Sequence, residues 1–174
     1  MHPLDKFSHC PVCGSTRFAV NNFKSKHCAD CGFTFYANPS SATAAFILRG
    51  DMLLVARRGK EPARGTLDLP GGFVDMDETA EEGIKREVLE ETGLTITAPR
   101  YLFSLPNRYV YSGMTIHTLD MFFRVEAETD AVPKAADDAA DLMWVPLGEV
   151  RPELFGLQSI RRGVEIFLSR STQF

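Results

Sequence analysis

A chain of 174 residues is long enough to bury one medium-sized hydrophobic core and to carry a small additional unit. Hydrophobic residues make up 44% of the chain and charged residues 24%, which is ordinary for a soluble globular protein. No apolar run approaches the roughly 20 residues that span a bilayer, and no apolar secretion signal opens the chain, so we expect a cytoplasmic protein without a membrane partner. The net charge of −4 gives the chain no general attraction for nucleic acid.

All four cysteines lie near the N-terminus, in two Cys-x-x-Cys-Gly motifs. Their spacing predicts a tetrahedral Zn²⁺ site with four thiolate ligands: Cys10, Cys13, Cys28 and Cys31. Disulfides or free thiols are the alternatives, and both are less expected in a chain without a secretion signal. We therefore expect a zinc ribbon over residues 1–36, folded by its structural Zn²⁺, and a second domain over residues 37–174.

The predicted ribbon has two alternative roles. Several basic and aromatic residues would suit a face that binds a nucleic acid strand: Lys6, Arg17, Lys24, Lys26, Phe7, Phe18 and Phe23. Four cations are a small patch, however, and scattered charge is common on protein surfaces. We therefore favour a structural or dimer-forming role, which leaves a homodimer open and does not favour nucleic acid as a partner.

The next segment predicts two strands and a glycine turn. Ser40–Leu48 and Met52–Arg57 are apolar runs on either side of a turn at residues 50–51. Arg57 opens a basic stretch and is a candidate phosphate contact, although a solvated loop is an equally good interpretation. Two consecutive glycines, Gly71 and Gly72, allow positive φ and close approach of the backbone.

An acidic helix is predicted over Ala80–Thr92. Thr79 and Glu82 form a Thr-x-x-Glu capping box at its start, and Gly93 suits a left-handed cap at its end. Three carboxylates are spaced i, i+3, i+4 and so share one face: Glu87, Glu90 and Glu91. Either this face is solvated, or it is partly enclosed and needs a hard divalent cation such as Mg²⁺.

The region after the helix is predicted to be mainly β-structure closed by a helix. Strands are expected at Thr95–Ile96, Tyr101–Leu105, Ile116–Glu126 and Leu142–Val145. Apolar residues recur at helical spacing from Leu157, and residues 129–141 form a polar connection. An aromatic and polar loop is expected over residues 104–113. It offers candidate substrate contacts in Arg108, for phosphate, and in Tyr109 and Tyr111, which could stack on a base or simply pack against the fold.

Residues 72–94 fit a longer pattern, G-x5-E-x7-R-E-U-x-E-E-x-G-U, in which U is a bulky aliphatic residue. No position is missing, and so many fixed positions rarely coincide by chance. The segment resembles the Nudix box. The resemblance implies an α/β fold, with an α/β/α sandwich around a mixed sheet, and an enzyme that hydrolyses a nucleoside diphosphate joined to another group.

The resemblance also implies a catalytic metal. Mg²⁺ or Mn²⁺ would lie against one backbone carbonyl and three carboxylates, those of Gly72, Glu87, Glu90 and Glu91. The metal would activate a water molecule that attacks phosphorus in line.

The resemblance also implies roles for residues other than the metal ligands. Arg86 would pair with Glu78 and hold the acidic face in register. The general base would be Glu90, Glu91 or an acid from another loop, for which Asp138 is the first candidate and Asp141 the second.

The ribbon and the box together resemble the zinc-ribbon Nudix proteins of the NADH pyrophosphatase type, over about residues 8–150. The signature S-Q-P-W-P-F-P-x-S that follows the box in that branch is matched only at Ser104 and Pro106. NADH, NAD, ADP-ribose or an FAD-like compound therefore all fit as the substrate. Removal of NAD caps from RNA and ligand sensing without turnover are the alternatives, although sensing domains usually lack some of the box carboxylates that are complete here.

Overall fold

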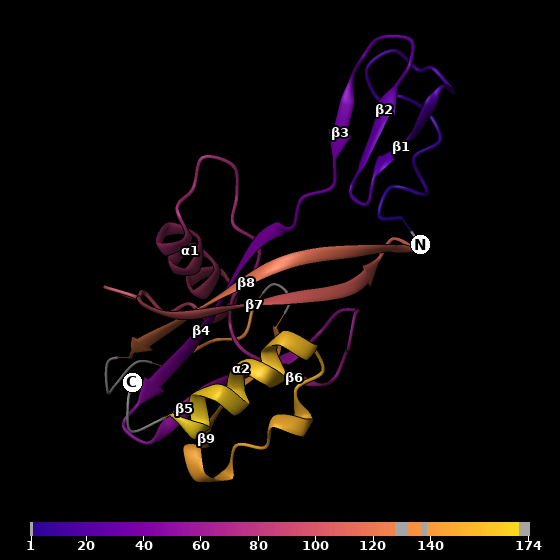
Figure 1. The fold of residues 1–174 in the computed structure, drawn as a ribbon. Helices are drawn as coiled ribbons and strands as arrows, with labels where there is room; N and C mark the ends of the chain where they lie inside the picture. Colours follow the sequence, from indigo (N-terminus) through magenta and orange to yellow (C-terminus); the bar gives the residue numbers. More distant parts are fainter. Residues whose placement is uncertain (1, 128–131, 137–138, 171–174) are drawn as a thin grey trace. The chain divides into compact units, whose positions relative to one another are not determined.

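The computed structural model describes residues 2–127, 132–136 and 139–170 (Figure 1). Contacts divide the chain into two compact units, Met1–Pro39 with Tyr109–His117, and Ser40–Arg108 with Thr118–Phe174. Among the described helices, none combines the length and the apolar character that crossing a membrane requires.

The smaller unit contains a three-stranded antiparallel sheet in the order β1-β2-β3. Its strands are short: β1 (Phe18–Asn22), β2 (Ser25–Cys28) and β3 (Thr34–Tyr36). Its buried core consists of Cys10, Phe18 and Cys28, with Phe33 packed against them. A core of this size contributes little hydrophobic free energy, so the unit needs a further source of stability.

The larger unit is built on a six-stranded sheet. The order is β6-β5-β4-β8-β7, and β9 pairs with β5. The β4–β8 pair is parallel, whereas β5 is antiparallel to β4, β6 and β9, so the sheet is mixed. The strands are β4 (Ser40–Arg49), β5 (Met52–Arg58), β6 (Leu67–Asp68), β7 (Arg100–Tyr111), β8 (Met114–Glu126) and β9 (Ala139–Pro146). The helices are α1 (Ala80–Thr92), η1 (Leu147–Glu149), η2 (Pro152–Leu154) and α2 (Gln158–Ser169).

The helices α1 and α2 cover opposite faces of this sheet (Figure 1). Successive side chains of a strand point to opposite faces. Ile47 of β4 accordingly packs with Ile84 and Val88 of α1. Its neighbour Phe46 packs on the α2 side, where its ring lies 4.1 Å from that of Phe167, centroid to centroid. The predicted α/β/α sandwich with a mixed sheet is confirmed.

The local predictions for α1 are confirmed in detail. The helix begins at Ala80 and ends at Thr92, and Gly93 adopts the left-handed conformation with φ 69°. The Thr79 Oγ1 accepts a hydrogen bond from the Glu82 N–H at 3.2 Å, and the Thr79 N–H donates to Glu82 Oε2 at 2.8 Å. Both halves of the capping box are therefore formed.

Two predictions in the β region are wrong. Residues 95–96 do not form a strand: Leu94 and Ile96 are buried in the α1-side core instead of pairing with a neighbour. The predicted loop over residues 104–113 belongs to β7 as far as Tyr111, and the turn comprises only Ser112 and Gly113, both with positive φ. Pairing with β8 supplies the hydrogen bonds for this extension, and Pro106 is tolerated because β7 is an edge strand.

The C-terminal predictions fare better. The helix expected from Leu157 is α2, which begins one residue later and buries Ile160, Val164 and Phe167. The strand expected from Leu142 is β9, which begins earlier, at Ala139. The end of the predicted polar connection is therefore part of the sheet, and its residues 129–131 and 137–138 lie outside the described chain.

We predict that Thr79→Ala lowers the free energy of unfolding by about 1 kcal/mol, because an orphan N–H of α1 loses its acceptor. Chemical denaturation followed by circular dichroism measures this. The matched control is Thr79→Ser, which keeps the hydroxyl and should retain most of the stability. Equal stability of the alanine variant and the native chain would contradict the proposed importance of the cap.

Candidate active site

The double glycine before α1 is fixed against strand β4. The Thr43 N–H donates to the Gly72 carbonyl at 2.8 Å, and the Ala45 N–H donates to the Pro70 carbonyl at 2.8 Å. Gly71 has φ 148°, and a Cβ on it would lie 2.2 Å from the Thr43 carbonyl oxygen. A side chain at this position would therefore push the turn away from the sheet.

Two box carboxylates point at this turn. A Cβ on Gly72 would lie 2.6 Å from the Glu87 carboxylate, so the missing side chain makes room for that group. The Gly71 N–H donates to Glu91 Oε2 at 3.0 Å. The side chain of Glu87 is only 15% exposed, whereas that of Glu90 is 49% exposed. The acidic face is therefore partly enclosed at Glu87 and open to solvent at Glu90.

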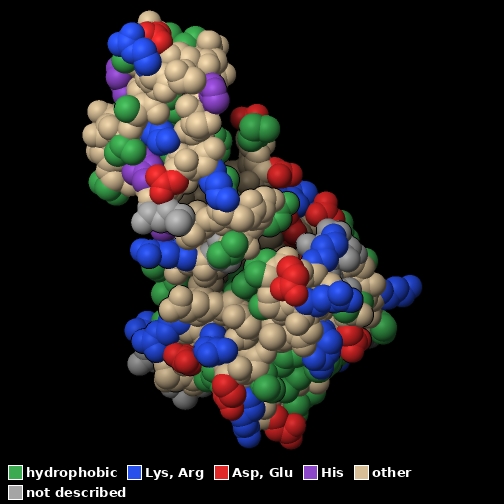
Figure 2. All heavy atoms as spheres, turned by 90° about the vertical axis from the view of Figure 1, so that its right-hand side faces the viewer, with side chains coloured by type: hydrophobic (Ala, Val, Ile, Leu, Met, Phe, Trp, Pro, Cys, Tyr) green, Lys and Arg blue, Asp and Glu red, His purple; other side chains and the backbone are tan. Residues whose placement is uncertain are grey.

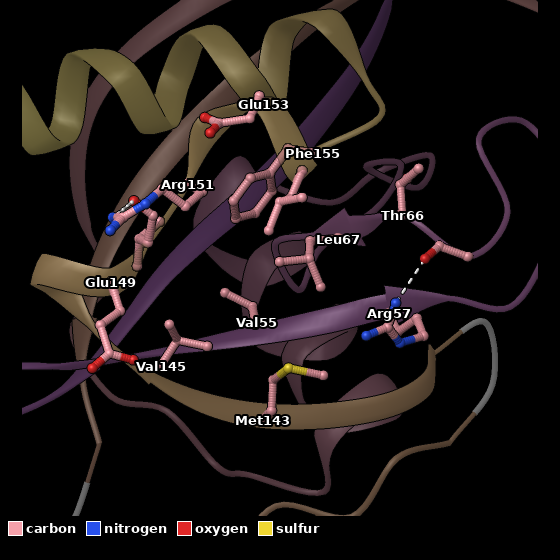
Figure 3. A pocket seen from close by; sticks show the side chains of 13 residues that line it. Val55, Arg57, Thr66, Leu67, Met143, Val145, Glu149, Arg151, Glu153 and Phe155 are labelled. Atoms are coloured by element: carbon pink, nitrogen blue, oxygen red, sulfur yellow. Dashed lines mark hydrogen bonds between the residues drawn. The ribbon is translucent and has the colours of Figure 1, made fainter.

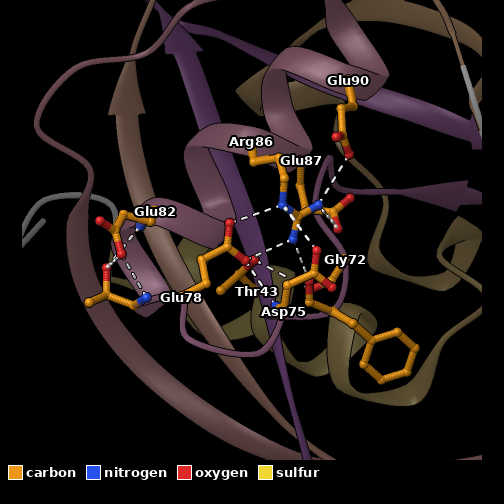
Figure 4. A network of polar contacts seen from close by, with 10 residues as sticks. Thr43, Gly72, Asp75, Glu78, Glu82, Arg86, Glu87 and Glu90 are labelled. Atoms are coloured by element: carbon orange, nitrogen blue, oxygen red, sulfur yellow. Dashed lines mark hydrogen bonds and ion pairs between the residues drawn. The ribbon is translucent and has the colours of Figure 1, made fainter.

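Arg86 lies at the centre of the acidic cluster (Figure 4). Its Nε and Nη2 donate to the two oxygens of Glu78, both at 2.9 Å, and Nη2 also donates to the Phe73 carbonyl at 2.9 Å. Its Nη1 donates to Glu87 at 2.8 Å and to Glu90 at 3.1 Å. A guanidinium has five N–H groups, so all of its donors are used. The predicted Arg86–Glu78 pair is present, and the contacts to Phe73, Glu87 and Glu90 are additional.

The same contacts shift the pKa values of the pair. Hydrogen bonds from Arg86 lower the pKa of the Glu78 carboxyl, and hydrogen bonds to Glu78 raise the pKa of Arg86 further above its usual value. A lowered carboxyl pKa stabilises the fold above the pKa of an unfolded glutamate. This contribution is lost as the pH falls through the lowered value.

The acidic face has the chemistry of a hard-cation site. Three carboxylates, of Glu78, Glu87 and Glu90, accept hydrogen bonds from a single guanidinium, Asp75 lies 3.7 Å from its Nε, and Glu91 lies on the same helix face. Carboxylate oxygens are the ligands that Mg²⁺ and Mn²⁺ prefer. In the part of the chain that the structure describes, no set of three carboxylate oxygens from this face lies within 4.8 Å of one another. Arg86 holds Glu87 and Glu90, so their oxygens would have to turn toward a bound cation.

The cysteines form a second candidate metal centre. The Cys10 and Cys31 Sγ atoms are 3.7 Å apart, and those of Cys13 and Cys28 are 3.6 Å apart. All four Sγ atoms lie within 4.8 Å of one another, and all four cysteines are free thiols rather than disulfides. The Cys31 backbone N–H helps to lower the pKa of the Cys28 thiol to about 6, whereas burial and the neighbouring thiols raise the pKa of Cys13 and of Cys31. The four thiols therefore fit the predicted Zn²⁺ site.

The predicted substrate contacts come from different strands and from both units. Tyr109 and Tyr111 belong to the smaller unit, Tyr111 is 61% exposed, and the side chain of Tyr109 is outside the description. Arg108 is exposed on β7 of the larger unit. Arg57 lies at the end of β5, where its Nη1 donates to the Gly65 carbonyl at 2.8 Å.

Asp138 and Asp141 are the two candidate general bases from the connecting segment, and the structure describes only one of them. Asp138 lies outside the described residues. Asp141 is exposed on β9, where it pairs in register with Arg57 of β5. The segment before β9 is fastened to the end of α1, because the Ala136 N–H donates to the Glu91 carbonyl at 3.1 Å.

A buried charge pair was not predicted from the sequence. Arg58 donates to Asp68, and both side chains are largely buried. Burial raises the pKa of Asp68 even though Arg58 opposes the shift. Arg58 stands in the run of basic residues that a solvated loop would also explain, so no sequence feature distinguishes it from Arg57.

Comparison with known proteins identifies the larger unit. The NUDIX domain model matches residues 38–164. The NAD-capped RNA hydrolase NudC of Stutzerimonas stutzeri (strain A1501) is 30% identical over 162 residues, which are 92% of this chain and 56% of that protein. This chain therefore spans little more than half the length of the curated relatives that it matches.

Solved structures share the fold. A NUDIX hydrolase from Nitrosomonas europaea matches with a TM-score of 0.76 and 19% identity, over 95% of this chain and 92% of that chain. A bifunctional NMN adenylyltransferase/ADP ribose pyrophosphatase from Francisella tularensis, complexed with AMP and a Mn ion, matches with a TM-score of 0.59 and 25% identity, over 78% of this chain and 42% of that chain. Because the family model covers most of the chain, this protein belongs to the Nudix hydrolases.

Proposed function

We propose that the protein hydrolyses the pyrophosphate of a nucleoside diphosphate joined to a second group, such as NADH, NAD, ADP-ribose or an FAD-like compound. The observation that carries the proposal is the complete set of box carboxylates, with Glu87 and Glu91 pointing at the double glycine and Arg86 held among them. A relative named as an NAD-capped RNA hydrolase and a structure named as an ADP ribose pyrophosphatase support this substrate class.

The chain would hold the cation with Glu87, Glu90 and Glu91 and with the carbonyl of Gly72. That carbonyl accepts hydrogen bonds from the Thr43 N–H at 2.8 Å and from the Thr43 hydroxyl at 3.4 Å, so the hydroxyl would have to turn away to leave a lone pair for a ligand. Mg²⁺ or Mn²⁺ would neutralise charge on the phosphate oxygens and would lower the pKa of a water molecule, which attacks phosphorus once it has lost a proton.

Other residues around this centre would position the metal ligands or accept a proton from water. Arg86 and Glu78 keep the turn and the helix face in register through their paired hydrogen bonds. Glu90 is more exposed than Glu78 and Glu87, so it is the first candidate to accept a proton from water. Glu91, which is bound to the Gly71 N–H, and Asp138 on the connecting segment are the other candidates.

The four cysteines are proposed to bind a structural Zn²⁺. Their Sγ atoms are already close together, and two of the cysteines belong to the small hydrophobic core of the smaller unit. Zinc coordination would supply the folding free energy that this core lacks. Residues 1–36 would then form the ribbon and residues 37–174 the hydrolase domain.

Binding of RNA by the ribbon is a second candidate function, suggested by the name of the NudC relative. Phe23 is 81% exposed, and the Lys24 Nζ lies 6.0 Å from its ring centroid, as in a platform for a stacked base. Two of the four cations are already engaged, however. Arg17 pairs with Asp30, and the Lys26 Nζ donates to the Phe7 carbonyl. Figure 2 shows basic and acidic side chains interspersed on the visible face, so we favour the small-molecule substrate.

The decisive experiment is a screen of Mg²⁺- or Mn²⁺-dependent hydrolysis over NADH, NAD, FAD, ADP-ribose and nucleoside triphosphates. We expect Glu90→Gln to lower kcat on the best substrate by about 100-fold or more, because the variant loses a metal ligand and a candidate base. The matched control, Glu81→Gln, changes an exposed acid in the first turn of α1 and should keep full activity. Full metal-dependent activity of Glu90→Gln would contradict the assignment.

We expect the purified chain to contain stoichiometric zinc. Its removal by a chelator should collapse the NMR signals of residues 1–36 while those of α1 and α2 keep their dispersion. Added Zn²⁺ should restore the lost signals, and excess Mg²⁺ should not, because thiolates prefer the softer metal. A ribbon that stays folded in a zinc-free preparation would refute the structural role.

RNA binding has its own test. A strand held by Lys6 and Lys24 should dissociate more readily with salt, with a slope of roughly −0.7 in log K against log salt for each phosphate neutralised. Lys24→Gln should reduce the slope by about that amount, whereas Lys60→Gln, in the other unit, should not change it. No binding at low salt would remove this candidate.

A further inference from the structure

A pocket of about 470 Å³ lies in the larger unit, bordered by β5, β6, β9 and the segment through η1 and η2. Its lining residues Val55, Met143 and Val145 belong to the α2-side core. Their neighbours Leu54 and Trp144 face the α1-side core. The pocket therefore opens on the face of β5 and β9 that is turned away from α1 and its carboxylates.

The pocket has an apolar floor between two charged ends (Figure 3). The floor is formed by Val55, Leu67, Met143, Val145 and Phe155. Arg57 and Thr66 lie at one end, and Glu149, Arg151 and Glu153 lie at the other (Figure 3). The first end presents the Arg57 guanidinium, with Asp141 as the register partner of Arg57 on β9, and the other carries two carboxylates against one guanidinium. A volume of this size with an apolar floor and few polar groups is typical of small-molecule sites.

The charged side chains of the pocket do not neutralise one another. In the described chain, none of the four takes part in an ion pair. Arg57 is anchored by one hydrogen bond, to the Gly65 carbonyl at 2.8 Å, so most of its five N–H groups have no protein acceptor. Arg151 folds back onto its own segment, where Nη1 donates to the carbonyls of Gly148 and Val150 at 3.0 and 3.2 Å. The carboxylates of Glu149 and Glu153 are exposed.

We propose that this pocket binds a 5′-mononucleotide whose base carries a positive charge. The phosphate pairs with the Arg57 guanidinium, which suits phosphate geometry. The flat base covers the floor around Val55 and Val145, with its positive charge at the end that carries Glu149 and Glu153. A ligand with one negative and one positive end satisfies both ends of the pocket, whereas a purely anionic nucleotide meets the carboxylates at the second end.

The choice of this ligand rests on the proposed function. Hydrolysis of the pyrophosphate in NAD releases AMP and nicotinamide mononucleotide, and the pyridinium ring of the latter is cationic. The pocket would thus hold one product of the reaction on the face of the sheet opposite α1. AMP has the same phosphate and ribose but a neutral base, which makes it the natural comparison.

The experiment is calorimetric titration of the zinc-containing chain without added Mg²⁺ or Mn²⁺. The probes are nicotinamide mononucleotide, AMP, nicotinamide riboside and inorganic phosphate. We expect nicotinamide mononucleotide to bind at least about tenfold more tightly than each of the others, because only this probe meets both ends of the pocket. Equal or tighter binding of AMP would overturn the proposal.

Substitutions locate the site. Arg57→Gln and the double variant Glu149→Gln/Glu153→Gln should each weaken binding of nicotinamide mononucleotide by about tenfold, and the double variant should leave AMP unaffected. The control is Arg162→Gln/Glu165→Gln, which removes an exposed ion pair of α2 outside the pocket. Unchanged binding in both pocket variants, or loss of binding in Glu90→Gln instead, would place the ligand elsewhere and refute the pocket.

The two proposals fail separately. Hydrolysis of NAD or NADH without binding of nicotinamide mononucleotide to the pocket would leave the enzyme and remove the site. Binding that depends on Arg57 and the two glutamates in a chain that hydrolyses none of the screened substrates would leave the site and remove the proposed reaction.

Discussion

The acidic face of α1 depends on one half-buried guanidinium, that of Arg86. Two carboxylates about 5 Å apart repel each other by roughly 3 kcal/mol at an effective dielectric of 20, and α1 brings several together. Arg86 offsets this repulsion with five hydrogen bonds. Three of them bind Glu78 and the Phe73 carbonyl, which fastens the turn to the helix, and two bind Glu87 and Glu90. One positive charge cannot balance four negative ones, so the face keeps a net negative charge that favours a cation.

This arrangement depends on the two glycines of the turn before α1, because neither carries a side chain. Glu87 occupies the space that a Cβ of Gly72 would fill, and Gly71 lies against the Thr43 carbonyl. The Gly71 N–H in turn fixes Glu91. The double glycine therefore contacts strand β4 on one side and the acidic helix α1 on the other. A methyl group at Gly71 would push the turn away from β4, and one at Gly72 would displace the Glu87 carboxylate.

Local signals could be predicted from the sequence, and contacts between distant segments could not. The ends of α1 follow from a capping box and a glycine within a few residues, and the cysteine cluster follows from two short motifs. The Arg86–Glu78 pair was expected because the family pattern links those positions. The length of β7 depends on its pairing with β8, so the aromatic and polar composition of that stretch was misleading. The charged pocket draws on β5, β6, β9 and the 149–155 segment, and no single stretch of sequence contains its pattern.

The two candidate metal centres differ in ligand chemistry in a way that keeps them independent. Thiolates are soft ligands that select Zn²⁺, whereas carboxylates and a backbone carbonyl are hard ligands that suit Mg²⁺ and Mn²⁺. The four Sγ atoms are already close together, but Glu87 and Glu90 are both hydrogen-bonded to the Nη1 of Arg86. A prearranged soft site binds its metal tightly and keeps it, which is what a structural role requires. A hard site whose ligands must first leave a guanidinium binds its metal more weakly, and this suits a cation that arrives and departs with a phosphate-bearing substrate.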